Sequence, residues 1–143
     1  MDQAKQLRSD CPISFTLDIV GDKWSLLIVR DAVFANKQTF SEFLQSDEGI
    51  ARNILADRLN RLTEKGIFTK QAHPVDGRKD IYTLTEKGLQ LLPMLLYMAS
   101  WGSNHEPRTH MNGLVVNNSQ DRQQLIADIT KDLRKKITIG KEA

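Results

Sequence analysis

The sequence predicts a mainly α-helical protein with one small β-hairpin, arranged as a winged helix-turn-helix with extra helices for dimerisation. Three observations lead to this fold class. A capping-box pattern opens a short helix, and a tight glycine-containing turn separates that helix from a longer one. The apolar period then changes from about 3.6 residues to about 2 over two short β-leaning runs, and helical periodicity resumes afterwards.

Two helices are predicted before the first polar break of the chain. Residues 12–20 begin with a proline, which suits a first helical turn. Their apolar side chains recur at helical spacing, at Ile13, Leu17 and Val20. Residues 23–35 are too apolar for an exposed surface helix, so we expect this second helix to be buried.

The next two helices form the predicted helix-turn-helix. Thr39 and Glu42 match a capping box, so we expect a short helix over residues 39–45. A longer helix is expected over residues 51–65, and Gly66 is placed to end it with a positive φ. The apolar stripe that we expect to face the core consists of Leu55, Leu59 and Leu62.

A hairpin and further helices complete the predicted fold. Residues 67–71 and 80–84 are β-leaning, and an Asp-Gly pair between them favours a turn. Thr85 is a suitable N-cap for the next helix. That helix contains Pro93, which we expect to kink it or to divide it in two.

We expect one winged helix-turn-helix domain over residues 1–105, including a dimerisation helix over residues 85–104. Residues 106–143 are expected to form a linker, with a short strand at 114–116, and an amphipathic helix over residues 120–137. A chain of 143 residues with 40% apolar residues is large enough to bury the core that this organisation requires.

Composition and charge exclude some classes of protein and limit the evidence for others. No run approaches the roughly 18 consecutive apolar residues that a membrane span needs, and the first residues lack the apolar core of a signal peptide. The single cysteine, Cys11, excludes an internal disulfide and favours a reducing, cytoplasmic location. Residues 1–84 hold twelve basic and twelve acidic residues, so a nucleic-acid footprint must come from where the charges lie.

The second helix of a helix-turn-helix enters the major groove with its N-terminal outward residues at the base edges. Arginine pairs with guanine, asparagine pairs with adenine, and alanine contacts the thymine methyl group. On the helix over residues 51–65, the side opposite the leucines is polar. The alternative is that these polar residues only keep the helix surface soluble. The residues of that side that we predict to read bases are Arg52, Asn53, Ala56 and Asp57.

Other polar residues are positioned for the DNA backbone. The residues predicted to contact phosphates are Lys37, Gln38, Thr39, Arg58 and Arg61. The predicted hairpin carries Arg78 and Lys79 near its tip, where a wing lies along a minor groove or on phosphates. A basic tip taken alone is more often a solvated turn, but its place after a helix-turn-helix favours a wing.

Several segments resemble the HxlR-type transcription regulators. They are residues 17–28 (LDIVGDKWSLLI), 40–43 (FSEF), 55–59 (LADRL) and 82–88 (YTLTEKG). Together with the Cys-Pro pair before them, they extend the resemblance over about residues 11–105. The resemblance implies a homodimer with one winged helix-turn-helix in each subunit, which binds an inverted-repeat operator in double-stranded DNA.

The chain departs from the pattern of these regulators at three places. Ala51 stands where a serine or threonine helix cap is common, and Asp22 stands where a second glycine is common. The wing tip has Asp76 and Gly77 where prolines are frequent.

Dimerisation is expected because two half-sites, about 34–36 Å apart, give an affinity that one winged domain lacks. The residues predicted to dimerise are Leu92, Leu95, Leu96 and Trp101. The alternative is that these side chains complete the core of the subunit. The same two alternatives apply to the helix over residues 120–137.

Cys11 precedes a proline at a helix start, where the helix dipole favours the thiolate. Many HxlR-type regulators have a cysteine at the matching place, and some respond through it to oxidants or electrophiles. The resemblance therefore implies that Cys11 senses a small electrophile or an oxidant, for example by a disulfide across the dimer. The alternative is a small residue at a helix boundary.

The sequence gives little support to an enzyme. It contains no nucleophile elbow, phosphate loop or zinc-protease motif, so we expect no catalytic activity and no cofactor. His73, His105 and His110 lack metal-ligand spacing, so no metal site is predicted. The alternative to a DNA-binding regulator is a winged helix used for protein–protein contact without DNA, which the neutrality of residues 1–84 favours.

Overall fold

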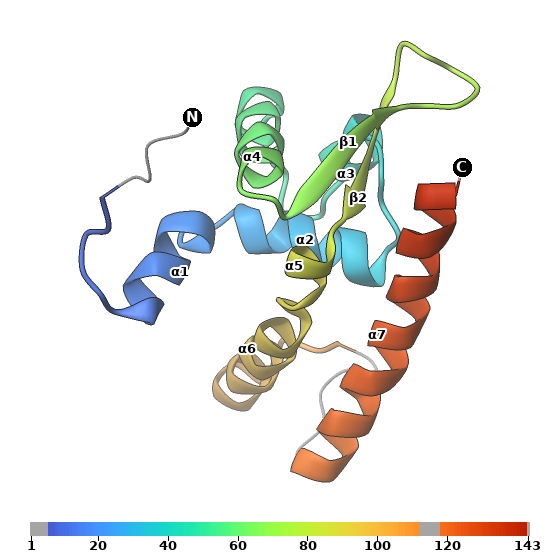
Figure 1. The fold of residues 1–143 in the computed structure, drawn as a ribbon. Helices are drawn as coiled ribbons and strands as arrows, with labels where there is room; N and C mark the ends of the chain where they lie inside the picture. The colour runs from blue at the N-terminus through green and yellow to red at the C-terminus, as the bar shows by residue number, and fades with distance from the viewer. Residues whose placement is uncertain (1–5, 112–117, 143) are drawn as a thin grey trace.

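A computed structural model describes residues 6–111 and 118–142 of the chain (Figure 1). The elements in chain order are α1 (Pro12–Val20), α2 (Ser25–Phe34), α3 (Phe40–Leu44), α4 (Arg52–Glu64), β1 (Phe68–Ala72), β2 (Asp80–Leu84), α5 (Glu86–Leu89), α6 (Leu92–His105) and α7 (Ser119–Glu142). The two strands form an antiparallel hairpin, so the predicted fold class is confirmed. The strand predicted at 114–116 lies outside the described residues.

Local signals set the ends of the helices in the helix-turn-helix. The Thr39 hydroxyl accepts a hydrogen bond from the Glu42 backbone N–H at 3.3 Å. The Glu42 carboxylate accepts one from the Thr39 backbone N–H at 3.0 Å, which completes the predicted capping box. Helix α4 begins after Ala51, whose side chain makes no capping hydrogen bond. Gly66 follows its end with a φ of +79°, as predicted.

The chain after the hairpin is divided as the sequence indicates. The Thr85 hydroxyl accepts a hydrogen bond from the Gly88 backbone N–H at 3.0 Å and caps α5. Pro93 lies in the first turn of α6, where its missing N–H costs no helical hydrogen bond, so the predicted helix is divided rather than kinked. A Cβ on Gly88 would lie 2.4 Å from the Ile67 carbonyl oxygen, so only glycine lets α5 approach this closely.

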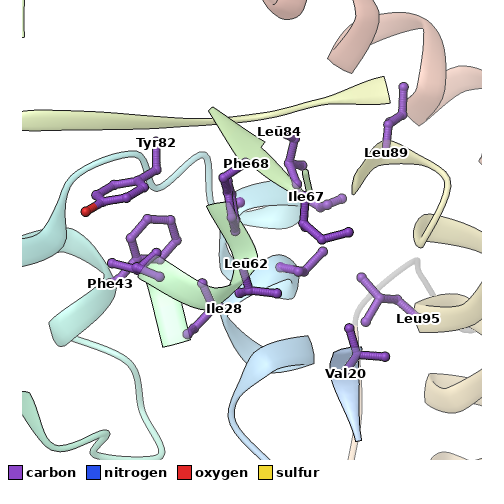
Figure 2. Packing of buried hydrophobic residues seen from close by; sticks show 14 of the residues in the cluster. Val20, Ile28, Phe43, Leu62, Ile67, Phe68, Tyr82, Leu84, Leu89 and Leu95 are labelled. Carbon is purple, nitrogen blue, oxygen red and sulfur yellow. The ribbon is translucent and has the colours of Figure 1, made fainter. Parts of the chain in front are cut away.

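The core lies where α2, α4 and the hairpin meet. The three leucines of α4 that were predicted to face inward are at most 1% exposed, and much of α2 is buried as expected. The rings of Phe43, Phe68 and Tyr82 pack edge to face, with centroids 6.1–6.5 Å apart (Figure 2). This core holds α4 against the rest of the domain, and the side of α4 opposite its leucines faces solvent.

Helix α6 corrects part of the dimerisation prediction. Leu92, Leu95 and Leu96 are 0%, 8% and 1% exposed, and they belong to the core of the subunit itself. Because α6 packs against α2, these side chains are already covered and present no surface to a second chain. Of the four predicted residues, Trp101 is the exposed one, at 69%.

Helix α7 includes the amphipathic helix predicted over residues 120–137 and packs on the same subunit (Figure 1, red). It contacts α5, α6 and β2. Leu133 is 6% exposed, and the Arg134 guanidinium lies 2.6 Å from the Glu86 carboxylate of α5. The other apolar side chains of α7 that pack against the core are Leu125, Ile126, Ile129 and Ile137.

Candidate nucleic-acid interface

Helix α4 presents its polar side to solvent. It packs through its leucines against α3 and β1, and it lies on the side of the hairpin away from α7 (Figure 1). The Arg52 guanidinium lies 5.5 Å from the centroid of the Phe40 ring, which orients this side chain at the start of the helix. The residues predicted to read bases are all exposed: Arg52, Asn53, Ala56 and Asp57.

Arg58 contacts the chain itself. Its Nε donates a hydrogen bond to the Asp22 carboxylate at 2.8 Å, and its Nη1 donates one to the Asp57 carboxylate. Asp22 also accepts hydrogen bonds from the backbone N–H groups of Trp24 and Ser25, both at 3.1 Å, at the start of α2. Because of these contacts, Arg58 ties α4 to the junction between α1 and α2.

The pKa of Asp22 reflects this position. Burial raises the pKa, but hydrogen bonds from the Ser25 hydroxyl, the Arg58 guanidinium and two backbone N–H groups outweigh burial and lower it to about 2. The carboxylate is therefore charged at neutral pH and favours the charged arginine beside it. Asp22 was noted in the sequence as a departure from the family pattern, but the partner on α4 was not predicted.

Arg61 makes a second contact between α4 and α1. Its Nη2 donates a hydrogen bond to the backbone carbonyl of Asp18 at 3.1 Å. Both arginines that were predicted to contact phosphates are thus engaged within the subunit, on the side of α4 that faces α1. They hold α4 in place in this structure.

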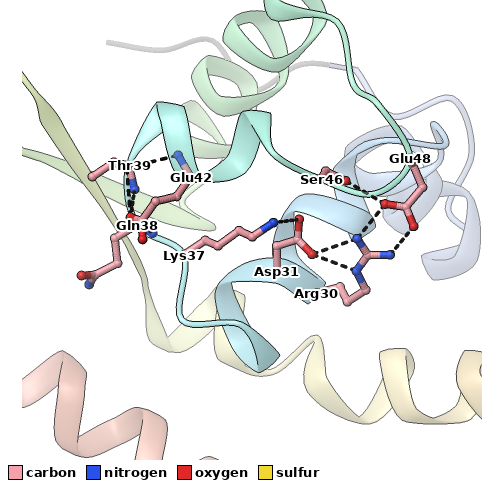
Figure 3. A network of polar contacts seen from close by, with 8 residues as sticks. All are labelled: Arg30, Asp31, Lys37, Gln38, Thr39, Glu42, Ser46 and Glu48. Carbon is pink, nitrogen blue, oxygen red and sulfur yellow. Dashed lines mark hydrogen bonds and ion pairs between the residues drawn. The ribbon is translucent and has the colours of Figure 1, made fainter. Parts of the chain in front are cut away.

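A network of charged residues braces the turn before α4 (Figure 3). The buried Asp31 carboxylate accepts hydrogen bonds from Arg30 at 2.8 Å and from Lys37 Nζ at 3.1 Å. Arg30 also reaches Glu48 at 2.7 Å, and this hydrogen bond is the main cause that lowers the pKa of Glu48 to about 2. This network was not predicted from the sequence, although a charged Arg30-Asp31 pair in an otherwise apolar helix is a signal for it.

The loop before α3 has one side chain free for a partner. Thr39 is engaged in the capping box, and Lys37 is engaged with Asp31. Gln38 is exposed, while its backbone carbonyl accepts a hydrogen bond from the Tyr82 N–H at 2.8 Å. This last contact joins the loop to β2, so the loop and the hairpin are held in one arrangement.

The hairpin projects beyond the helices and carries the two basic residues near its tip (Figure 1). The side chain of Arg78 is 92% exposed, and Lys79 is exposed. His73 Nδ1 accepts hydrogen bonds from the backbone N–H groups of Val75 and Asp76, both at 3.1 Å, and this organises the turn. Hydrogen bonds from the Arg78 backbone and side chain lower the pKa of Asp76.

A second surface, on α1 and α6, is apolar and exposed. We call it the α1–α6 patch. Between the two helices lies a cavity of about 480 Å³, lined by apolar side chains of both helices, such as Leu17 and Met98. The patch consists of Ile13 (70% exposed), Phe15 (47%), Leu17 (55%), Tyr97 (57%), Met98 (50%) and Trp101 (69%).

Cys11 lies beside this patch. It is the N-cap residue of α1, its thiol is free and exposed, and its backbone N–H donates to the Ser9 hydroxyl at 3.3 Å. Within residues 6–111 and 118–142, no three His, Cys, Asp or Glu side chains are arranged to hold a metal ion. None of the helices described there has both the length and the apolar character to cross a membrane.

The helical core, the adjoining two-stranded hairpin and the pair α3–α4 define a winged helix-turn-helix protein. The second helix of that pair, α4, presents its polar side to solvent. The profile of the HxlR-like helix-turn-helix family matches residues 19–110. The chain belongs to this family.

Named relatives agree with this assignment. The uncharacterised HTH-type transcriptional regulator Rv3095 of Mycobacterium tuberculosis is 36% identical over 92 residues, which cover 64% of this chain and 57% of the relative. This chain therefore spans little more than half of that relative's length.

Solved structures show the same fold. PA1607, a candidate transcription factor, superposes with a TM-score of 0.67 at 38% identity, over 78% of each chain. The reduced form of the transcriptional regulator YodB from Bacillus subtilis gives a TM-score of 0.55 at 30% identity, over 71% of this chain and 100% of YodB. YodB in its quinone-bound form is similar as well, at 28% identity and a TM-score of 0.54.

Proposed function

We propose that this protein is a transcription regulator that binds specific sequences in double-stranded DNA as a homodimer. The observation that carries the proposal is the exposed polar side of α4, whose opposite side is fixed in the core. A helix held in this way fits a major groove, which is about 12 Å wide. The proposal includes no enzymatic activity, and its DNA target implies a cytoplasmic location.

The base contacts are assigned to the first two turns of α4. Arg52 and Asn53 pair with guanine and adenine edges, Ala56 contacts a thymine methyl group, and Asp57 accepts from cytosine. All four side chains are exposed, which supports this assignment.

The backbone contacts are assigned to two flanking elements. One is the loop before α3, where Gln38 is exposed and Lys37 and Thr39 are held beside it, and the other is the wing, with Arg78 and Lys79. Arg58 and Arg61 reach phosphates only by exchanging their present partners on the α1 side, so their first role is to orient α4.

The dimer is assigned to the α1–α6 patch. Ile13, Leu17 and Met98 of this patch line one cavity between α1 and α6 and are each at least half exposed, and exposed apolar side chains that gather in this way mark an interaction surface. A dimer across this surface leaves α4 free in both subunits, because the polar side of α4 takes no part in the patch.

Cys11 is assigned a sensing role at the edge of this interface. An exposed thiol at a helix start is accessible to electrophiles and to a second thiol. The similarity to YodB, which has been solved with bound quinone, supports a quinone-type electrophile. Alkylation or oxidation of the thiol then changes how the two subunits pack, and with it the spacing of the two α4 helices. Replacement by serine, Cys11→Ser, is expected to abolish release of DNA by diamide or a quinone.

The deciding experiment is selection of bound sequences from random double-stranded DNA, followed by fluorescence-anisotropy titration of the selected site. A palindromic site and a steep loss of affinity with salt are expected. Arg52→Ala should cost about 1–3 kcal/mol and relax specificity at one position of each half-site. Equal weakening on all sequences would make Arg52 a phosphate contact. Failure to enrich any sequence would favour a winged helix that binds protein instead, as the neutral charge of residues 1–84 suggests.

A further inference from the structure

A cavity separates α7 from the hairpin, on the side of the subunit away from α4. Its volume is about 550 Å³, within the range of pockets that hold small organic molecules. Its walls come from the end of α2, the loop before α3, the root of the hairpin and α7. Helix α7 lies beyond the residues that the family profile matches.

The lining of this cavity is apolar at its base. Ala32 and Leu84 come from the core of the subunit, and Leu133 and Ile137 come from the facing side of α7. A cavity with such walls favours a ligand with an apolar body, since burial of that body removes apolar surface from water. Leu133, packed into the core, holds α7 in place as its outer wall.

The charged residues among the described lining of the cavity are both positive. Two lysines, Lys37 and Lys136, are among the described residues that line it, and no aspartate or glutamate is among them. The Lys37 ammonium is already compensated by Asp31, 3.1 Å away. The Lys136 ammonium donates a hydrogen bond to the neutral Asn36 side chain, so its positive charge is available to an anion.

We propose that this cavity binds a small organic anion with an apolar body, of the aromatic carboxylate class. The carboxylate pairs with Lys136 at the rim, and the ring lies between β2 and α7. A charge-assisted hydrogen bond to a lysine orients such a ligand and sets its preference for anions over neutral molecules of the same shape.

The site also touches two elements to which the proposed function assigns DNA contacts. Gln38 and Pro74, at the loop before α3 and at the base of the wing, both line the cavity. If the proposed function holds, occupancy of the cavity changes the affinity for DNA, because a ligand there contacts both the loop and the base of the wing.

The test uses 2-naphthoate as the probe and 2-naphthamide as its neutral counterpart, with binding to the purified full chain followed by calorimetry. We expect saturable binding of one naphthoate per subunit and at least about tenfold weaker binding of the amide. Lys136→Met should weaken naphthoate about tenfold. Lys135→Met removes the same charge from the adjacent exposed residue, which is absent from the described lining, and should leave the affinity unchanged.

A second variant keeps the test decisive. Thr83→Trp places a large side chain into the cavity from a partly buried position of β2 and should abolish binding while thermal unfolding stays cooperative. Equal naphthoate affinity in the Lys136→Met and Lys135→Met proteins would overturn the proposal, and so would unchanged binding to the Thr83→Trp protein. Because the measurement contains no DNA, its failure is independent of any failure of the proposed function.

Discussion

Helices α1 and α7 both carry apolar side chains at helical spacing, but they use them differently. Leu17 of α1 is 55% exposed, whereas Leu133 of α7 is 6% exposed. Polar contacts join α4 to α1 at the Asp18 carbonyl, through Arg61, and to the α1–α2 junction at Asp22, through Arg58, while α7 packs on the core through a line of leucine and isoleucine side chains. A hydrophobic stripe therefore identifies a helix that needs a partner surface, but not whether that surface belongs to the same chain.

The strongest test of this difference is the loss of a leucine from each helix. Leu133→Ala should lower the free energy of unfolding by about 2–4 kcal/mol, since it leaves a cavity in a packed region. Leu17→Ala should change it by less than about 1 kcal/mol, because that side chain is largely in water already. Urea unfolding in a Trp101→Ala background, in which the proposed dimer is weakened, measures both. Similar losses in the two proteins would contradict the distinction.

The next test concerns what covers the α1–α6 patch. Trp101→Ala should raise the dimer dissociation constant by at least about tenfold, because large aromatic side chains dominate interface energetics. Analytical ultracentrifugation over a concentration series measures this constant. Val75→Ala removes an apolar side chain of the wing that is more exposed than Trp101, at 90% against 69%, and should have no effect. A monomeric wild-type protein at all concentrations would remove the basis for the dimer.

A pH titration tests the polar contact between Arg58 of α4 and Asp22 at the α1–α2 junction. The pKa of Asp22 is lowered to about 2 in the folded protein from an ordinary value of 3.8. Its contribution, on the order of 2 kcal/mol, is present above about pH 4 and is lost as the pH falls through the folded pKa. Asp22→Asn should therefore be destabilised at neutral pH, and the difference from wild type should narrow between about pH 4 and pH 2.

The control for this titration is Asp47→Asn, which removes one negative charge from an exposed turn. Urea unfolding at a series of pH values should show a constant, small difference for this variant. A difference for Asp22→Asn that does not depend on pH would mean that the carboxylate has no special stabilising role.

The smallest effect is expected at the ion pair that joins α7 to α5. The Arg134 and Glu86 side chains are 60% and 50% exposed, so water and salt screen their attraction. Arg134→Ala should leave the melting temperature of the protein within experimental error of wild type. A clear decrease would show that α7 depends on this contact and not chiefly on its apolar side.

The sequence by itself determined the local structure of this protein. The Thr39–Glu42 capping box, the positive φ at Gly66, the hairpin turn and the helix break at Pro93 all depend on residues close together in the chain. The face of α4 also followed from sequence, because a single helical period places its leucines on one side and its polar residues on the other.

Only the tertiary structure decided which surfaces meet. Periodicity did not show that the leucines of α6 are covered by α2, that Arg58 reaches Asp22 across 36 positions, or that α7 and the hairpin line one cavity. Such contacts depend on how helices far apart in the chain are placed relative to one another. An arginine or an apolar stripe is compatible with several partners, and the packing of the whole domain selects one of them.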